Sequence, residues 1–167
     1  MANLQAFLKS ISKQDRPLDE ATNLINDLVS ENTSMGNFIT FFWGIIDQES
    51  KELTYVNAGH NPPLLLRNGE LNYLTEGGML LGLMETMVPY KSDTLKLEKN
   101  DCLILFTDGV TEAMNPGNEE YSDERLENLS KDIFMLSSWE ILESIQESVK
   151  KFTKEALQSD DFTTLVV

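Results

Sequence analysis

The sequence is short of several residue types, and each shortage argues against a class of protein. Cys102 is the only cysteine, so the chain can form neither an internal disulfide nor a cysteine-cluster metal site. Because Cys102 lies within an apolar run, we expect a buried and unreactive thiol. No apolar stretch approaches the roughly 20 residues of a membrane span, and no basic-then-apolar leader is present. The sequence therefore predicts a cytoplasmic protein that does not insert into membranes.

Basic residues are also scarce. Lysine and arginine number 13 against 28 aspartate and glutamate residues, which gives a formal net charge of −15. A chain this acidic repels phosphate backbones and anionic lipids, so we expect neither nucleic acid nor a membrane surface as a partner. Cations and proteins with basic patches suit it instead. The sequence also lacks a glycine-rich phosphate loop before a helix and any Ser-His-Asp or Cys-His arrangement.

The length of 167 residues, 41% of them hydrophobic, is enough for one domain with a core of its own. Pro17, with Asp19 and Glu20 just after it, is typical of a helix start. Apolar residues then recur at helical spacing as far as about Asn32. The sequence therefore predicts an N-terminal helix.

From residue 37 the pattern changes to that of strands. Residues 37–47 and 52–59 predict a hairpin whose first strand is buried on much of both faces. Asn68 and Gly69 lie between two further apolar runs and predict a tight hairpin turn. Residues 102–106 predict a buried strand.

The C-terminal third predicts helices. Ser122 is the expected N-cap of a short helix, and Ser137 with Glu140 three residues later fits a capping box before a longer one. The apolar stripe of that longer helix comprises Ile141, Leu142, Ile145, Val149, Phe152 and Ala156. Trp43 and Trp139 lie in segments with core patterning, so we expect both to pack inside.

The order of elements is helices, strands, helices and a final strand that begins after Asp160 and Asp161. This order predicts an α+β fold in which helices cover antiparallel sheets. The final strand must return to a sheet that earlier segments form.

Aspartates stand where two of these strands meet a turn. Asp108 follows the buried strand, and Asp160 and Asp161 precede the last one. If the two strands are antiparallel neighbours, the end of the first strand and the start of the last strand lie at one edge of the sheet. The carboxylates would then meet at that edge. Mg²⁺ and Mn²⁺ take such oxygen ligands, and Gly109 would let the backbone bend tightly beside an ion. Asp-Gly and Asp-Asp pairs are also common turn and cap features, so spacing alone leaves both interpretations open.

His60 is the only histidine and stands in a turn before Asn61, Pro62 and Pro63. It could act as a general acid, as a metal ligand, or as a turn residue whose ring bonds the backbone. The residues around it do not decide among these three roles.

Three separated motifs carry a resemblance to a known family. They are YVNAGHNPPLLL at 55–66, LILFTDGVTEAMN at 103–115 and QSDDFTTLVV at 158–167. In this order they resemble the PPM (2C-like) metal-dependent protein serine phosphatases, most of all the bacterial SpoIIE/RsbU branch. The match runs from about Pro17 to Val167.

The resemblance implies two antiparallel sheets packed face to face and flanked by helices. It implies two Mn²⁺ or Mg²⁺ ions that activate a water for attack on a phosphoserine or phosphothreonine. Asp108 matches one metal-binding aspartate of the family and Asp160 matches another, with Gly109 and Asp161 beside them. His60 matches a turn that shapes the site. The implied substrate is a phosphorylated anti-sigma-factor antagonist of the STAS type.

The family pattern also contains two segments that this sequence lacks. A Gly-Asp-x-x-Asp strand and a Gly-Asp-Val-Ser-Gly-x-Gly loop supply aspartates that bridge the ions, whereas the only Asp-Gly here is at Asp108. We therefore expect residues 1–167 to be a single N-terminally truncated domain, weak or inactive alone, which follows a sensor or receiver domain in a longer protein. The alternative is a degenerate phosphatase fold that binds partners without hydrolysis. A smaller departure is Ser122, where the branch more often has glycine.

Overall fold

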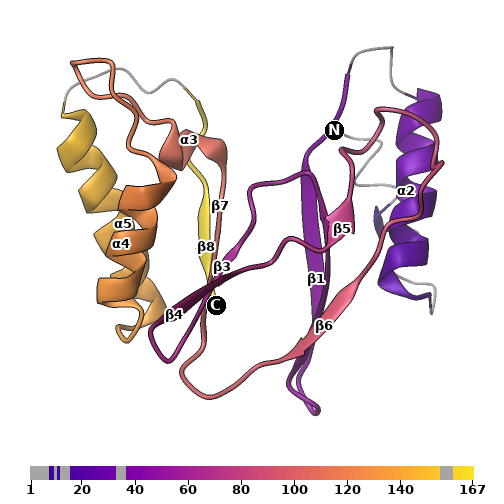
Figure 1. Ribbon diagram of the computed structural model, residues 1–167, viewed down its shortest axis with the longest axis horizontal. Coiled ribbons are helices and arrows are strands. Elements are labelled where there is room, and N and C mark those ends of the chain that lie inside the picture. The colour runs from indigo at the N-terminus through magenta and orange to yellow at the C-terminus, as the bar shows by residue number, and fades with distance from the viewer. Residues whose placement is uncertain (1–7, 10, 12–15, 33–36, 155–159) are drawn as a thin grey trace. The chain divides into compact units, whose positions relative to one another are not determined.

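The computed structural model describes residues 8, 9, 11, 16–32, 37–154 and 160–167. It contains two β-sheets and several helices, which confirms the predicted α+β class. The chain divides into two compact units (Figure 1), namely Met1–His60 with Thr75–Leu97 and Asn61–Leu74 with Glu98–Val167. Of the helices described, none is both long and apolar enough to cross a membrane.

The first unit contains one sheet and helix α2 (Leu18–Asn32), which begins directly after Pro17 as predicted. Strands β1 (Phe41–Asp47) and β2 (Glu52–Ala58) form the predicted antiparallel hairpin. Strand β6 (Asp93–Lys96) pairs antiparallel with β2. Strand β5 (Gly77–Gly78) pairs with the end of β2 over two residues in parallel, a short exception to the antiparallel pattern that the sequence predicts.

A buried core joins α2 to β2. Its members include Leu18, Ala21, Ile25, Val29, Val56, Ala58, Leu81 and Tyr90. Helical spacing along α2 and alternation along β2 bring these side chains onto facing sides. Trp43 of β1 packs against this core as predicted, and its Nε1–H donates to Thr22 Oγ1 of α2 at 3.0 Å.

Strand β1 is more exposed than its composition predicts. Ile45 and Ile46 are 56% and 40% exposed, although we expected a strand buried on much of both faces. Among the strands that the structure describes, β1 pairs with β2 alone. A β-branched and aromatic composition therefore indicates a strand correctly but does not indicate how many neighbours it has.

The sheet of the second unit has the strand order β4-β3-β7-β8. Strands β3 (Leu64–Arg67) and β4 (Glu70–Tyr73) form a hairpin around Asn68 and Gly69. These two residues have φ values of 53° and 82°, as a tight two-residue turn requires. Strand β7 (Cys102–Phe106) pairs antiparallel with β3 and with β8 (Thr164–Val166). The last strand thus returns to a sheet of earlier segments, as predicted.

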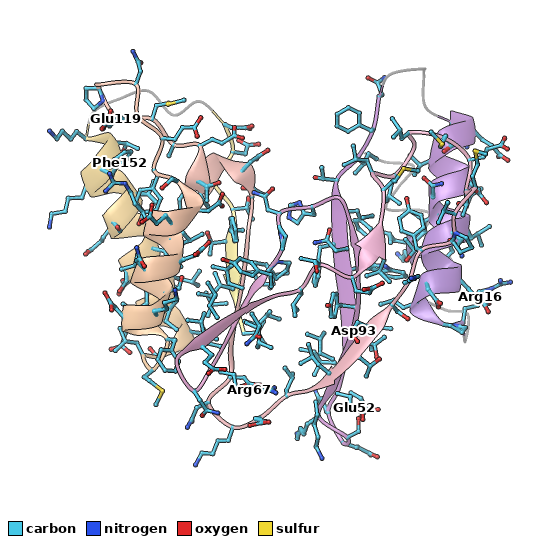
Figure 2. The ribbon with its side chains drawn as sticks, in the orientation of Figure 1. Arg16, Glu52, Arg67, Asp93, Glu119 and Phe152 are labelled. Atoms are coloured by element: carbon cyan, nitrogen blue, oxygen red, sulfur yellow. The ribbon has the colours of Figure 1, made fainter. Side chains whose placement is uncertain are left out.

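Helices α4 (Asp123–Ile133) and α5 (Ser138–Thr153) lie against this sheet (Figure 1). Helix α5 starts with the predicted capping box, because Ser137 and Glu140 each accept the backbone N–H of the other. The buried core of this unit includes Leu64, Leu66, Ile104, Phe106, Val110, Tyr121, Leu126, Ile141, Ile145 and Val149. Phe152, labelled in Figure 2, packs edge-on against the Tyr121 ring with 5.5 Å between centroids.

The stripe predicted for α5 is confirmed over its described length. Its buried members are Ile141, Ile145 and Val149, and Leu142 and Phe152 pack against them. Ala156 lies outside the described residues. The prediction for Trp139 is wrong, because its side chain is 68% exposed. Trp139 stands two residues before Ile141, which turns it about 200° around the helix and away from the buried face.

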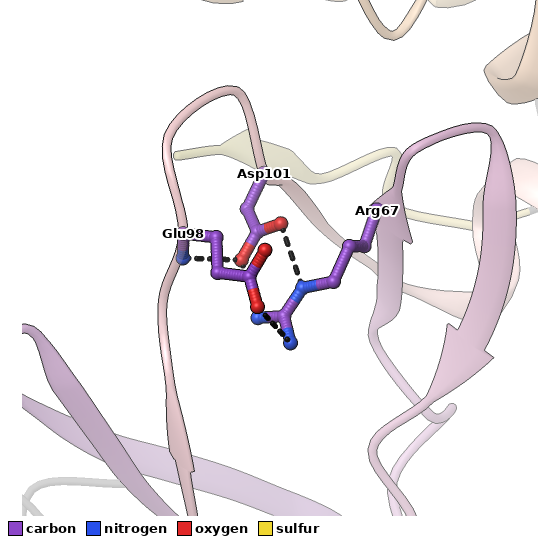
Figure 3. Close-up of polar contacts among 3 residues, drawn as sticks. All are labelled: Arg67, Glu98 and Asp101. Atoms are coloured by element: carbon purple, nitrogen blue, oxygen red, sulfur yellow. Dashed lines mark hydrogen bonds and ion pairs between the residues drawn. The ribbon is translucent and has the colours of Figure 1, made fainter.

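A partly buried ion pair supports the register of β3 against β7. Leu66 pairs with Cys102, which puts Arg67 opposite Asp101. Arg67 Nε donates to Asp101 Oδ1 at 3.0 Å and Nη2 donates to Oδ2 at 2.6 Å (Figure 3). The Asp101 side chain is only 6% exposed. Burial alone would raise the pKa of Asp101, but hydrogen bonds from Arg67 and from the Glu98 N–H lower it below its ordinary 3.8.

Ser122 differs from its predicted role. It does precede α4, but its side chain makes no capping hydrogen bond. Its backbone has φ 74° and ψ 154°, a region that glycine occupies readily and other residues occupy only under strain. The backbone is held there because the Ser122 N–H donates to Thr111 O at 2.8 Å. Glycine, which the family resemblance led us to expect here, would adopt this conformation without that strain.

We predict that Arg67→Leu destabilises the protein by about 3 kcal/mol at neutral pH, because it leaves the Asp101 carboxylate buried without its partner. Since the folded-state pKa of Asp101 lies below 3.8, the stabilisation is complete above that pH and disappears as the pH falls through the lowered pKa. Urea unfolding between pH 7 and pH 3 should show the gap between wild type and variant closing at acidic pH. Glu98→Gln, which alters only an exposed ion pair, is the control. A gap independent of pH would contradict this account.

We also predict that Ser122→Gly stabilises the protein by about 1 kcal/mol, since glycine relieves the strained φ at a smaller entropic penalty. The urea midpoint at neutral pH is the measurement. Ser122→Ala is the matched control, because it removes the hydroxyl and keeps the Cβ atom, so it should bring no gain. Equal stabilisation by both substitutions would show that the hydroxyl, and not the backbone angle, is responsible.

Candidate functional site

The pairing of β7 with β8 brings two distant turns to one edge of the second sheet. Phe106 pairs with Thr164, so Thr107 and Thr163 follow at the next position. The Thr107 N–H donates to Thr163 O, and the Thr163 N–H donates to Thr107 Oγ1, both at 3.1 Å. Thr107 Oγ1 donates in turn to Asp161 O at 2.9 Å. The antiparallel adjacency that the sequence argument assumed for these strands is therefore confirmed.

Gly109 allows the two turns to come this close. A Cβ atom at Gly109 would collide with the carbonyl oxygen of Asp161 and lie 2.9 Å from its carbonyl carbon. The carbonyl carbon of Asp160 would be 3.4 Å away. The structure thus gives Gly109 a role that the sequence analysis did not predict, because the glycine leaves room for the backbone of Asp160 and Asp161, above all for the Asp161 carbonyl.

Asp108 and Asp160 make the same local hydrogen bond. The Oδ1 atom of each accepts the N–H of the next residue, from Gly109 at 2.9 Å and from Asp161 at 2.7 Å. Both aspartates are exposed, so water and ions can reach their carboxylates. Asp108 is also the first residue of a single helical turn, α3 (Asp108–Thr111), which the sequence analysis did not predict.

The side-chain groups at this edge that could bind a metal ion include the carboxylates of Asp108, Asp160 and Asp161 and the Thr107 hydroxyl. All are oxygen atoms, the ligand type that Mg²⁺ and Mn²⁺ prefer. Within residues 16–32, 37–154 and 160–167, however, no three His, Cys, Asp or Glu side chains are grouped so that they could hold a metal ion. The oxygen ligands at this edge are therefore of the type that a hard divalent cation prefers. Among the described residues, however, there are too few of them to hold the ion.

His60 is the last residue of its segment of the first unit. Its N–H donates to Asn57 Oδ1 at 2.8 Å, and its carbonyl accepts from Asn57 Nδ2 at 3.0 Å. Its Nδ1 lies 3.2 Å from Thr40 Oγ1, and the preceding Gly59 has a φ of 69°. These bonds shape the turn. A role for the imidazole as acid or ligand stays a prediction.

Cys102 is buried on β7 and forms no disulfide. Burial raises the pKa of its thiol, so little thiolate exists at neutral pH. The structure therefore agrees with the expectation of a buried, unreactive thiol.

Two threonines at this edge were missed by the sequence analysis. Thr107 and Thr163 connect the turns that carry Asp108 and Asp160 through their backbone and hydroxyl groups. The sequence signal was the position of each threonine, close to an aspartate inside a motif that carries the family resemblance. No local rule indicates that a threonine will bond to a segment so far away in the sequence.

Comparison with known proteins finds relatives along the whole chain. The family model for stage II sporulation protein E (SpoIIE) matches residues 1–167. The chain is 33% identical over 149 residues to Protein IcfG of Synechocystis sp., covering 88% of this chain and 23% of IcfG. It is 32% identical over 146 residues to phosphoserine phosphatase RsbU of Bacillus subtilis, covering 86% of this chain and 42% of RsbU. The chain thus spans less than half the length of these curated relatives.

Solved structures share the fold. The PP2C phosphatase domain of Bacillus subtilis SpoIIE, with a fragment of its regulatory domain, matches with a TM-score of 0.80 at 21% identity, covering 98% of this chain and 48% of that one. The catalytic domain of the serine/threonine protein phosphatase PstP, in complex with two manganese ions, matches with a TM-score of 0.60 at 17% identity, covering 98% and 76%. At these identities the likeness concerns the fold.

We predict that Gly109→Ala destabilises the protein by about 2 kcal/mol, because its Cβ atom forces the two turns apart. Gly117→Ala is the control, since the nearest atom to its Cβ would be the exposed side-chain oxygen of Asn115 at 3.1 Å and not a backbone atom. Thermal or urea unfolding of both variants gives the comparison. Equal losses in the two variants would mean that the contact between Gly109 and the Asp161 carbonyl has no special importance.

Proposed function

The chain belongs to the stage II sporulation protein E (SpoIIE) family, and from this premise we propose that it is the C-terminal part of a metal-dependent protein serine/threonine phosphatase domain of the PP2C type. Two relatives support the reaction class, since RsbU is a phosphoserine phosphatase and the matched SpoIIE domain is a PP2C phosphatase. The observation that carries the proposal is the convergence of the Asp108 and Asp160 turns at one edge of the sheet.

In this proposal Asp108 and Asp160 are metal ligands, and Gly109 and Asp161 support them. Their oxygen donors suit Mn²⁺ or Mg²⁺, and the related PstP domain holds two manganese ions. Because the described residues offer too few ligands for two ions, the others must come from elsewhere. We assign them to the two Gly-Asp segments of the family pattern, in a longer protein of which this chain is a part.

When bound, the ions supply a water of lowered pKa and neutralise charge on the phosphoryl group. The task of the chain's own residues is to hold the ligands in place. Bonds from the Gly109 and Asp161 N–H groups restrict rotation of the Asp108 and Asp160 carboxylates. Thr107 bonds to the backbone of Asp161 and Thr163, so the backbone segments that carry the two carboxylates stay together.

The substrate that we propose is a phosphoserine on an anti-sigma-factor antagonist of the STAS type, with a sensor or receiver domain preceding the phosphatase. The net charge of −15 repels a phosphorylated protein at long range. Recognition therefore depends on basic patches of the substrate facing the acidic surface, and on cations that attract the phosphate locally.

The alternative is a phosphatase fold that binds partners without hydrolysis. One observation favours it, namely that no three potential ligands gather among the described residues. Both hypotheses predict weak Mn²⁺ binding by this chain alone. They differ once the missing ligands are supplied, because only the first then predicts turnover.

The test is to join residues 1–167 to a segment that carries both Gly-Asp motifs and to assay phosphate release from a phosphoserine protein with Mn²⁺. We predict turnover that falls at least about 100-fold in Asp108→Asn and in Asp160→Asn, since each removes a ligand charge. Asp132→Asn, an exposed residue of α4, makes the same change of charge elsewhere and should leave the rate unaltered.

Absence of turnover in the joined protein, despite a folded circular dichroism spectrum, would favour the non-catalytic module. Turnover that is indifferent to Asp108→Asn would contradict the proposed ligand while leaving the family assignment intact.

A further inference from the structure

The connection between β5 and β6 exposes a group of large apolar side chains. Met79, Met84, Met87 and Val88 are 47%, 44%, 80% and 72% exposed. Single apolar residues on a surface are normal, but a contiguous group marks an interaction site. Figure 1 shows this connection running beside α2, within the first unit.

The segment is held by side chains of α2. Asn26, which is buried, donates from Nδ2 to Met84 O and to Thr86 Oγ1, both at 2.9 Å. Its Oδ1 accepts the Gly82 N–H at 2.9 Å. The side-chain amide of Asn26 thus forms hydrogen bonds with three polar groups of the connection between β5 and β6.

Two further residues of α2 complete this attachment. Asp27 Oδ1 accepts the Thr86 N–H at 2.8 Å, and Asn23 Oδ1 accepts the Tyr90 N–H at 2.9 Å. The Thr86 hydroxyl also donates to Asn23 O at 3.3 Å. The exposed methionines therefore stand on a backbone that is already fixed, which lowers the entropy lost when a partner docks.

The connection surrounds a hollow of about 320 Å³. Its apolar lining includes Met79, Met84, Met87, Val88 and Pro89. Its charged lining is mainly acidic, with Glu76 and Glu85 against the single Lys91. We call this surface the methionine groove and define it by Met79, Met84, Met87, Val88, Glu76 and Glu85.

We propose that the methionine groove binds an amphipathic helix of a partner protein, with lysine or arginine residues flanking the apolar face of that helix. Methionine side chains are flexible and polarizable, so they adapt to the apolar face of a helix laid into a groove. Glu76 and Glu85 select basic residues next to that face. This role is independent of the phosphatase reaction.

Charge also decides against a second copy of the chain as the occupant. Each copy carries a formal charge of −15, and the charged residues that line the groove, Glu76 and Glu85 against Lys91, are net negative where the copies would meet. Two such surfaces repel each other, whereas a basic helix is attracted by the same charges.

The experiment uses the full chain and a fluorescein-labelled 18-residue peptide of leucine and lysine with all leucines on one helical face. Fluorescence anisotropy in about 0.15 M salt limits long-range attraction. We expect Met87→Ser combined with Val88→Ser to weaken binding at least about tenfold, because both side chains are exposed anchors. Glu76→Gln combined with Glu85→Gln should weaken it about threefold. Met135→Ser combined with Leu136→Ser, at an exposed pair in the second unit, should leave binding unchanged.

Three results would overturn the proposal. One is equal binding of a peptide with the same composition in scrambled order, which would mean attraction by charge alone. Another is equal binding of a leucine-glutamate peptide, which would remove the role of the acidic lining. The third is self-association of the chain in sedimentation without peptide, abolished by the Met87 and Val88 substitutions, which would make a second copy the occupant.

Discussion

Antiparallel pairing of β7 with β8 is the constraint on which the proposed site depends. Neither the Asp108 turn nor the Asp160 turn is unusual alone. They become neighbours because Phe106 pairs with Thr164 and because Thr107 extends the pairing by bonds to Thr163 and Asp161. A slip of one residue in this register would move the side chains of β8 to the opposite face. The register is therefore as important for the site as the aspartates themselves.

The rest of the second unit supports that register. Strand β7 is held on its other side by β3, and the bidentate contact between Arg67 and Asp101 fixes that pairing at its end. The buried side chains of α4 and α5 cover the sheet. The first unit has a comparable link, in which Asn23, Asn26 and Asp27 of one helix hold a long connection. In both units polar side chains fix the backbone at places where regular pairing ends.

Features with a local cause could be predicted from the sequence. The Asn68-Gly69 turn, the capping box at Ser137 and the start of α2 after Pro17 all depend on neighbouring residues. The exposure of β1 could not be predicted, because it depends on what packs against the strand. The exposure of Trp139 follows from its helical spacing from Ile141, which the prediction of core patterning overlooked. The prediction of a side-chain cap at Ser122 is wrong, because the position of Ser122 before α4 comes with a backbone conformation that its residue type did not indicate and with no capping hydrogen bond. For the site, the order of the three motifs indicated which aspartates are candidate metal ligands. The contact of Gly109 with the Asp161 carbonyl, by contrast, appears only once the strands are paired.

The central claim is that the Asp108 and Asp160 turns act on one common ion. Paramagnetic broadening by substoichiometric Mn²⁺ tests it directly, since exchange lets even weak binding mark nearby amides in the nitrogen-15 NMR spectrum of the full chain. The account predicts that resonances of residues 107–110 and 160–163 broaden together and before all others. Broadening of only one of these segments, or strongest broadening at another acidic turn, would contradict it.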